Sequence, residues 1–198
     1  MVKFQKNSTI LLLVLFSISL NVNSQSNSPE LPIDLTTNKI MYTDVVHTDS
    51  TLLKADLFTL ARIWFAETFR TSGAVIQMED KESGVLIGKA IVPIIYKSFG
   101  VTHDLQNVLF TLSIYFKDGR YKYEMTDFIY QQQSPSPLIE FNDIPFEYIY
   151  FNKNLGVRKY NKKTRLSFVN QLDTQVKIIL KDLISSMDKK NTPVDSEW

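Results

Sequence analysis

The segment from residue 108 to residue 130 constrains the fold of this chain more than any other. It reads VLFTLSIYFKDGRYKYEMTDFIY, and its centre, Asp118–Gly119, is typical of the two-residue type I′ turn of a β-hairpin. With Lys117 opposite Arg120, one face of this hairpin is apolar and collects four pairs: Phe116 with Tyr121, Ile114 with Tyr123, Leu112 with Met125, and Val108 with Ile129. Turn chemistry and alternation therefore select the same register, which predicts an antiparallel sheet with this face covered.

The opposite face of the hairpin is mostly polar and is expected to meet solvent. Its cross-strand pairs are Tyr115 with Lys122, Ser113 with Glu124, Thr111 with Thr126, and Leu109 with Phe128. Asp127 does not fit this pattern, because the same register places it on the apolar face opposite Phe110. A buried unpaired charge is strongly unfavourable, so we expect this carboxylate to find a polar partner or to reach solvent.

A second hairpin is predicted from AVIQMEDKESGVLIGKA, residues 74–90. If residues 81–84 form a four-residue loop with Gly84 left-handed, Asp80 lies opposite Val85. The face expected beneath helices then pairs Met78 with Ile87, Ile76 with Lys89, and Ala74 with Ile91. The face expected to be open holds Val75, Gln77, Glu79, Leu86, Gly88 and Ala90. Lys89 is thus placed on the covered face, where it could pair with Asp127 or, like it, extend to solvent past a helix end.

Helical spacing flanks the two hairpins. Residues 39–46 indicate a strand, and after them apolar residues recur at intervals of three and four, with Ser50 as the expected N-cap. This stripe consists of Leu53, Leu57, Leu60, Ala61, Trp64 and Phe65. Trp64 is expected to pack in the core against the sheet rather than to stack on a ligand. A long amphipathic helix over residues 163–188 has a second stripe, made of Leu166, Val169, Leu172 or Asp173, Val176, Leu180, Leu183 and Met187.

The order of these elements predicts one α+β domain over residues 38–188. It should contain an antiparallel sheet of about five strands with two helices packed on one face. Residues 131–162 are expected to form a long aromatic loop that holds a short extra strand near residues 146–151. A polar leader over residues 25–37 should precede the domain, and a flexible tail over residues 189–198 should follow it.

The first residues predict export. Residues 1–24 combine Lys3 and Lys6 with an apolar run over residues 10–20 and a cut after Ser24, the pattern of a secretory signal peptide. That run is shorter than the roughly 20 residues that span a bilayer, so no transmembrane span is expected after cleavage. The sequence has no cysteine, which excludes a cysteine-anchored lipid, disulfides and cysteine-bound metals. We expect the mature chain in the periplasm, at the cell surface or outside the cell.

The signal peptide, the strand and helix that carry Trp64, the VIQMEDKESGVLIGKA hairpin and the strand–Asp–Gly–strand unit resemble one exported Bacteroidetes family. This family is a domain of unknown function, number 4468 in its series, with a TATA-binding-protein-like fold. The resemblance covers about residues 38–130, and the hairpin is its most specific part. It implies a curved antiparallel sheet with helices on its convex side, and it implies no catalytic residues.

The fold of this family suggests DNA binding, which the residues oppose. The chain has 22 lysines and arginines against 21 acidic residues, and the expected open face balances acids with bases. A sheet that grips DNA needs an excess of cations and apolar wedges that open base steps. We therefore expect no nucleic-acid partner.

The sequence shows no catalytic constellation, which favours a protein that is not an enzyme. His47 and His103 stand outside every metal-binding pattern; Asp104 beside His103 forms half a site at most, in a predicted loop. There is no nucleophile elbow and no glycine-rich phosphate loop, so no metal or cofactor is expected. Glu79 and Glu124 are the carboxylates that could act as a hydrolytic pair if they shared a groove.

Three functions stay open at this point. The favoured one is a non-enzymatic binding or interaction module that meets an envelope protein, a peptide or a glycan through the helix-free face of the sheet. The second is a structural or assembly component of the envelope, which would use the aromatic segment 141–151 or the C-terminal helix. The third is a hydrolase that uses carboxylates on the open face. The candidate partner-binding residues are Gln77, Glu79, Thr111, Ser113, Tyr115, Lys122 and Glu124.

Overall fold

The computed structural model describes residues 29–70, 75–98, 101–131, 143–152 and 160–188. The predicted signal peptide and C-terminal tail lie outside these residues. The elements in chain order are β1 (Ile33–Asp34), β2 (Lys39–Ile40), β3 (Tyr42–His47), α2 (Lys54–Thr68), β4 (Val75–Asp80), β5 (Val85–Ser98), β6 (Val101–Lys117), β7 (Arg120–Gln131), β8 (Ile144–Pro145), α3 (Phe146–Tyr150) and α4 (Lys162–Ser186).

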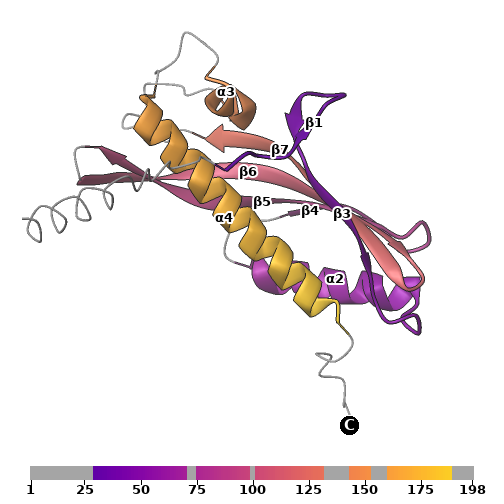
Figure 1. Ribbon diagram of the computed structural model, residues 1–198. Helices are drawn as coiled ribbons and strands as arrows, with labels where there is room; N and C mark the ends of the chain where they lie inside the picture. The colour runs from indigo at the N-terminus through magenta and orange to yellow at the C-terminus, as the bar shows by residue number, and fades with distance from the viewer. Residues whose placement is uncertain (1–28, 71–74, 99–100, 132–142, 153–159, 189–198) are drawn as a thin grey trace, which may run out of the picture.

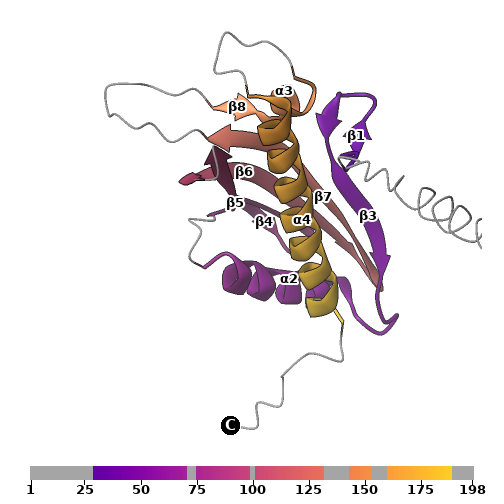
Figure 2. The same ribbon diagram turned by 60° about the vertical axis from the view of Figure 1, so that its left-hand side comes forward.

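One antiparallel sheet forms the centre of the molecule, and its strand order is β3-β7-β6-β5-β4. The short strand β8 also pairs with β7, beyond the residues that pair with β3. The helices α2 and α4 lie on the same side of this sheet, and they contact each other (Figures 1 and 2). The predicted α+β class, with two helices packed on one face, is therefore confirmed, and the sheet has six strands where about five were expected.

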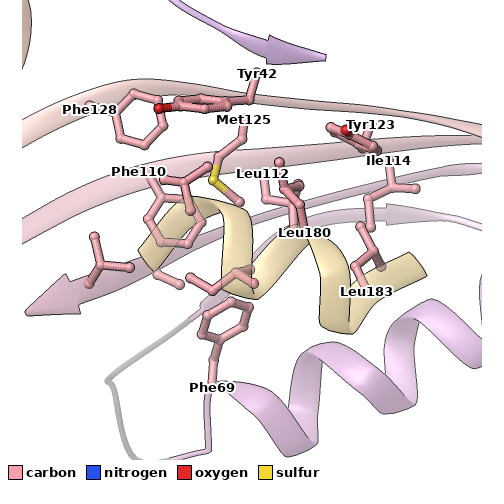
Figure 3. Close-up of a cluster of buried hydrophobic side chains, with 14 of the residues drawn as sticks. Tyr42, Phe69, Phe110, Leu112, Ile114, Tyr123, Met125, Phe128, Leu180 and Leu183 are labelled. Carbon is pink, nitrogen blue, oxygen red and sulfur yellow. The ribbon is translucent and has the colours of Figure 1, made fainter. Parts of the chain in front are cut away.

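The core lies between the sheet and the two helices (Figure 3). Alternate residues of β5, β6 and β7 point toward the helices and are almost completely buried: Leu86, Ala90, Val92, Ile94, Phe110, Leu112, Ile114, Tyr123, Met125 and Phe128. From the helices they meet Leu57, Phe65, Phe69, Leu172, Val176, Leu180 and Leu183. Trp64 is 3% exposed, as expected for a core residue, and its ring Nε1 donates to Asp182 of α4 at 2.7 Å. This hydrogen bond ties the two helices together above the sheet.

The β6–β7 hairpin has the predicted register near its turn and departs from it further along. Lys117 pairs with Arg120, and the pairing runs unbroken as far as Thr111 with Thr126. Beyond that point β7 contains one extra residue, so Leu109 pairs with Ile129 and Val108 with Tyr130. The predicted pairs Val108–Ile129 and Leu109–Phe128 are therefore wrong, because a β-bulge shifts the register by one. The bulge occurs at Asp127, whose φ is +53°.

The turn of this hairpin is not the expected type I′, which needs positive φ at both central residues. Gly119 has a φ of +68°, but Asp118 has no positive φ. The turn is instead shaped by the segment before α2. Gly119 donates to the carbonyl of Leu52 at 2.9 Å, and the Asp118 carboxylate accepts the N–H of Lys54 at 2.7 Å.

This contact also explains where α2 begins. The predicted N-cap, Ser50, is wrong, since Leu53 occupies the N-cap position and Lys54 is the first helical residue. Two carboxylates accept backbone N–H groups at this end of the helix: Asp118 from the hairpin turn, and Asp56, which accepts the N–H of Leu53 at 3.1 Å. Negative groups at a helix N-terminus are stabilising, so the turn and the helix fix each other's position.

The β4–β5 hairpin has the predicted loop but the opposite orientation from the one expected. Asp80 pairs with Val85 and Gly84 has a φ of +70°, as predicted. A bulge between Ile76 and Met78 then makes Gly88 the partner of Ile76, so the predicted Ile76–Lys89 pair is wrong. More importantly, Leu86, Gly88 and Ala90 face the helices, whereas Met78 is 49% exposed and Lys89 is exposed.

The close approach of α2 to β5 explains this orientation. A Cβ atom on Gly88 would stand 2.3 Å from the Phe65 ring, so only glycine lets this ring reach the strand. A glycine within a strand often marks such an approach. The small residues Gly88 and Ala90, which suggested an open surface, are small because the helix lies directly on them.

The helix α4 protects part of the sheet edge. Where β4 has ended, the Gln171 side chain accepts the N–H of Ile95 at 2.7 Å and donates to its carbonyl at 3.1 Å. Pro93 lies two residues earlier on β5, so its backbone nitrogen faces the same edge of the sheet. Proline has no N–H that could be left unpaired there. Strand edges with free N–H groups recruit other strands, so both features discourage pairing at this edge.

Three other segments differ from expectation. The strand predicted near residues 146–151 is the short helix α3, with the two-residue strand β8 just before it. The leader is not entirely outside the fold, because Leu31 is 1% exposed and Ile33 lies in β1. His103 lies in β6 rather than in a loop. The C-terminal helix was predicted over 163–188 and is found over Lys162–Ser186, where Asn161 caps it by accepting the N–H of Thr164 at 2.9 Å.

A substitution at Gly88 tests the packing of α2 on β5. Gly88→Ala should lower the free energy of unfolding by about 1–3 kcal/mol, because the added methyl group overlaps the Phe65 ring. Denaturant unfolding measures the change. Ser113→Ala, on the other face of the sheet, is the control and should stay within about 0.5 kcal/mol of the wild type. If Gly88→Ala were as neutral as Ser113→Ala, α2 would not pack where the structure places it.

Candidate binding face

The side of the sheet opposite α2 and α4 is the candidate functional surface, and we call it the open face. Cross-strand pairing arranges its side chains in rows, because paired residues share a face of the sheet. Four of these rows, in order from the hairpin turns inward, are Asp80, Val85, Tyr115, Lys122 and Val45; Met78, Ile87, Ser113, Glu124 and Thr43; Val75, Lys89, Thr111 and Thr126; and Ile91, Leu109 and Ile129.

The open face is more apolar than the sequence suggested. Several of its large side chains are exposed: Tyr115 by 38%, Val45 by 46%, Met78 by 49% and Val75 by 54%. Val85, Ile87 and Ile91 of β5, Leu109 of β6 and Ile129 of β7 are half-buried. Within the described residues no helix covers them. Exposed apolar side chains gathered on one face are the kind of surface that contact sites use.

One ion pair, formed by Lys122 and Glu124 of β7, lies among these apolar side chains. Lys122 Nζ lies 2.6 Å from Glu124 Oε1, and both residues project from β7 on the same face. The hydrogen bond that Lys122 donates to Glu124 and the negative charge of that carboxylate raise the pKa of the Lys122 ammonium. Because the lysine is exposed, this pair contributes little to stability. Its effect is to neutralise both charges in the middle of the face.

Five of the seven predicted binding residues lie together on the open face: Thr111, Ser113, Tyr115, Lys122 and Glu124. Glu79 does not, because it pairs with Leu86 and forms an ion pair with Arg62 of α2 at 2.7 Å, on the helix side. Gln77 stands in the β4 bulge and is exposed. Glu79 and Glu124 are thus on opposite sides of the sheet, so the shared groove that the hydrolytic pair needs is absent.

Of the two alternatives for Asp127 and Lys89, the mutual pair is not formed, and Lys89 is exposed. Asp127 Oδ1 lies 2.6 Å from Lys39 Nζ, and both side chains are about half exposed. This contact lies in the part of β7 between the residues that pair with β3 and the residues that pair with β8. The bulge turns Asp127 out of the apolar layer, so the misfit noted in the sequence marks this irregularity in β7.

Sequence reasoning missed the apolar members of the open face. Met78, Ile87 and Ile91 were assigned to the covered side, because large residues were taken to be inside and small ones outside. The informative signal was Gly88 within a strand, since a missing side chain there indicates that another element lies on it. Read this way, the sequence would have assigned Leu86 and Ala90 to the helix side.

A depression lies at the end of the open face nearest the two hairpin turns. It encloses about 370 Å³, is partly open to solvent, and is lined mainly by apolar atoms. Val45, Val85 and Tyr115 of the first row form its apolar part. Lys117, Arg120 and Lys122 supply cations at its margin, and no acidic residue lines it.

Neither a metal centre nor a membrane-spanning helix is found in the part of the chain that the structure describes. No group of three or more His, Asp or Glu side chains there is arranged to hold a metal ion. None of the described helices is both long and apolar enough to cross a membrane.

The architecture and the open face define the class of this protein as an α+β domain with a TBP-like fold. Residues 42–131 match a family model whose description is "Domain of unknown function (DUF4468) with TBP-like fold". The resemblance seen in the sequence is therefore confirmed for these residues. No curated protein matches the chain.

Two solved structures have the same fold. The chain is similar to a TBP-like protein from Parabacteroides distasonis, with a TM-score of 0.62 and 18% identity over 82% of this chain and 98% of that one. It is also similar to a DUF4468 family protein from Bacteroides ovatus, with a TM-score of 0.63 and 13% identity over 79% of this chain and 90% of that one. At these identities the likeness shows the fold alone.

Two buried tyrosines allow a matched test of the packing beneath the open face. The Tyr42 hydroxyl donates to Asp173 Oδ1 at 3.0 Å, whereas the Tyr121 hydroxyl is buried with no hydrogen-bond partner among the described residues. Tyr42→Phe should lower the free energy of unfolding by about 1.5–3 kcal/mol, since it leaves the buried Asp173 with one partner fewer. Tyr121→Phe should leave that free energy unchanged or raise it. Chemical denaturation at neutral pH measures both, and an equal loss in the two variants would contradict the placement.

The same pair has a pH signature. Burial, with Asp173 next, raises the pKa of Tyr42, and burial, with Tyr123 and Asp44 next, raises the pKa of Tyr121. Because the folded protein favours the neutral phenols, these tyrosines contribute fully to the free energy of unfolding below the pKa of about 10 that tyrosine has in the unfolded chain. This contribution is lost as the pH rises above that value. Tyr121→Phe should reduce this alkaline loss in a pH series of unfolding experiments.

Proposed function

We propose that this protein is an exported, non-enzymatic binding module that uses the open face of its sheet. The observation that supports it is the apolar strip on a face without helices, where Val45, Met78 and Tyr115 are exposed in the rows nearest the hairpin turns. Interface cores are enriched in tyrosine and methionine and depleted of charge, and the Lys122–Glu124 pair leaves this area near neutral. The partner we expect is an envelope protein, a peptide or a glycan.

The geometry favours this function over the two alternatives. A hydrolase would need paired carboxylates in one groove, and Glu79 and Glu124 are on opposite sides of the sheet. Phe151 at the end of the aromatic segment is 42% exposed, but a lipid-facing role for this segment is disfavoured, because Phe146 is 0% exposed and Ile149 is 7% exposed. Both side chains are used to pack α3 on the domain.

A capture experiment with matched variants tests the proposal. The mature chain is immobilised and exposed to an extract of the cells that produce it, and retained proteins and glycans are identified. Tyr115→Ala combined with Lys122→Ala should abolish specific capture, since it removes an exposed ring and a cation from the first row. The loss should exceed tenfold if the tyrosine is an anchor worth at least about 2 kcal/mol.

The control removes the same kinds of side chain from the other side of the molecule. Ile178→Ala combined with Lys181→Ala changes two exposed residues on the outer surface of α4. This variant should capture partners as the wild type does. Equal capture by both double variants, with both folded by circular dichroism, would place the binding surface elsewhere.

A further inference from the structure

The depression at the turn end of the open face is built for a particular kind of ligand. Its apolar part is one cross-strand row, in which Val85 pairs with Tyr115 and, two strands further, Val45 pairs with Lys122. Val85 and Tyr115 lie on adjacent strands and Val45 lies on the other side of Lys122, so an apolar chain can follow this row over the stem of the lysine. The volume of about 370 Å³ suits a small organic molecule rather than a folded partner.

The margin of the depression carries uncompensated positive charge. Lys117 and Arg120 face each other at the last pair of the β6–β7 hairpin, and neither forms an ion pair with any described residue. Lys122 differs from them, since Glu124 neutralises it. The two free cations stand together at the end of the apolar row.

Asp118 and Asp80, at the two adjoining turns, accept backbone N–H groups, and Glu82 of the β4–β5 turn forms no ion pair with a described residue and does not line the depression. Asp118, between Lys117 and Arg120 in the chain, accepts the N–H of Lys54 and so caps α2. Asp80 accepts the N–H groups of Glu82 and Ser83 within its own loop, each at 3.0 Å. Neither Asp118 nor Asp80 lines the depression. The positive charge at its margin is therefore available to an anion from outside.

We propose that this depression binds a small amphipathic carboxylate, a free medium-chain fatty acid in its ionised form. The hydrocarbon chain would lie along Val85, Tyr115 and Val45, and the carboxylate would meet Arg120 and Lys117. Guanidinium and carboxylate groups match in geometry and can form two parallel hydrogen bonds. Apolar burial then supplies affinity, and the cations select an anion over a neutral molecule of the same shape. This inference rests on the proposed function and assigns a ligand class to one end of the same face.

The first experiment compares three probes by isothermal titration calorimetry or by chemical-shift perturbation in NMR. Decanoate, kept below its micelle concentration, should bind saturably, with shifts at Tyr115 and Val85. Decanol, which has the chain but no charge, and acetate, which has the charge but no chain, should each bind at least about tenfold more weakly. Absence of saturable decanoate binding, or equal binding of decanol, overturns the inference.

The second experiment uses variants of the two free cations. Arg120→Gln and Lys117→Gln should each weaken decanoate binding, by about tenfold for the arginine, since hydrogen bonds to charged groups contribute the most. Lys181→Gln on α4 removes one positive charge far from the open face in the fold and should leave the affinity unchanged. If all three variants weaken binding alike, the effect is one of net charge and the inference is wrong.

The outcomes separate this inference from the proposed function. If decanoate fails to bind but Tyr115→Ala with Lys122→Ala still abolishes partner capture, only the ligand class is wrong. If an acidic peptide binds at these residues and decanoate does not, the ligand class is again wrong and the open face remains a binding surface. If both experiments fail, the open face has no binding role.

Discussion

The contact between Phe65 and Gly88 is the constraint on which the rest of the structure depends. It lets α2 lie directly on β5, and this contact decides which alternate residues of β5 enter the core. Once Leu86 and Ala90 face the helix, Val85, Ile87 and Ile91 must face the other way, because side chains alternate along a strand. Because paired residues share a face of the sheet, the orientation of β5 also determines which residues of β6, β7 and β3 face the helices. The apolar character of the open face is therefore a consequence of helix packing on the opposite side.

A second set of contacts ties the helices to the ends of the sheet. The Asp118 carboxylate caps α2 from the β6–β7 turn, Gln171 of α4 bonds both backbone groups of Ile95, and Asp182 links α4 to Trp64. The first two pair backbone groups where the hydrogen bonding of α2 begins or that of β4 has ended, and the third joins the two helices through their side chains. Together they hold both helices on one side, which leaves the opposite side without cover among the described residues.

Much of the fold follows from the sequence, and the failures have physical causes. The Asp–Gly turn determines the register from Lys117 to Thr111 because turn and alternation agree. The bulge at Asp127 was visible only as a charge in the wrong place, since one inserted residue has no local signature beyond that misfit. The N-cap of α2 could not be predicted, because one of the capping carboxylates is 64 residues away in the chain.

The candidate site shows the same division. Tyr115, Lys122 and Glu124 were placed correctly because they lie on the hairpin with a well-determined register. The β5 residues were inverted because both of its faces carry aliphatic side chains, so periodicity alone gives no direction. Gly88 within the strand is the local signal of the side on which another element lies, and the structure identifies that element as Phe65 of α2.

The fold alone does not assign a function, since a TBP-like sheet can serve unrelated purposes. What distinguishes this chain is the combination on its open face: an apolar strip, a neutralised ion pair in the middle, and two free cations at one end. A nucleic-acid surface would carry cations along its whole length. Here Lys89 is the exposed cation of the third row, and Lys117 and Arg120 stand together at the margin of one depression, which fits the recognition of one small anionic group.

The orientation of β5 is the central claim, and single-cysteine labelling tests it most directly because the natural sequence contains no cysteine. Ile87→Cys and Leu86→Cys place a thiol on adjacent residues of the same strand. The structure predicts that the thiol at position 87 reacts readily with a polar maleimide in the folded protein, while the thiol at position 86 reacts only after unfolding. Rapid labelling at position 86 with protection at position 87 would invert the sheet and contradict the account.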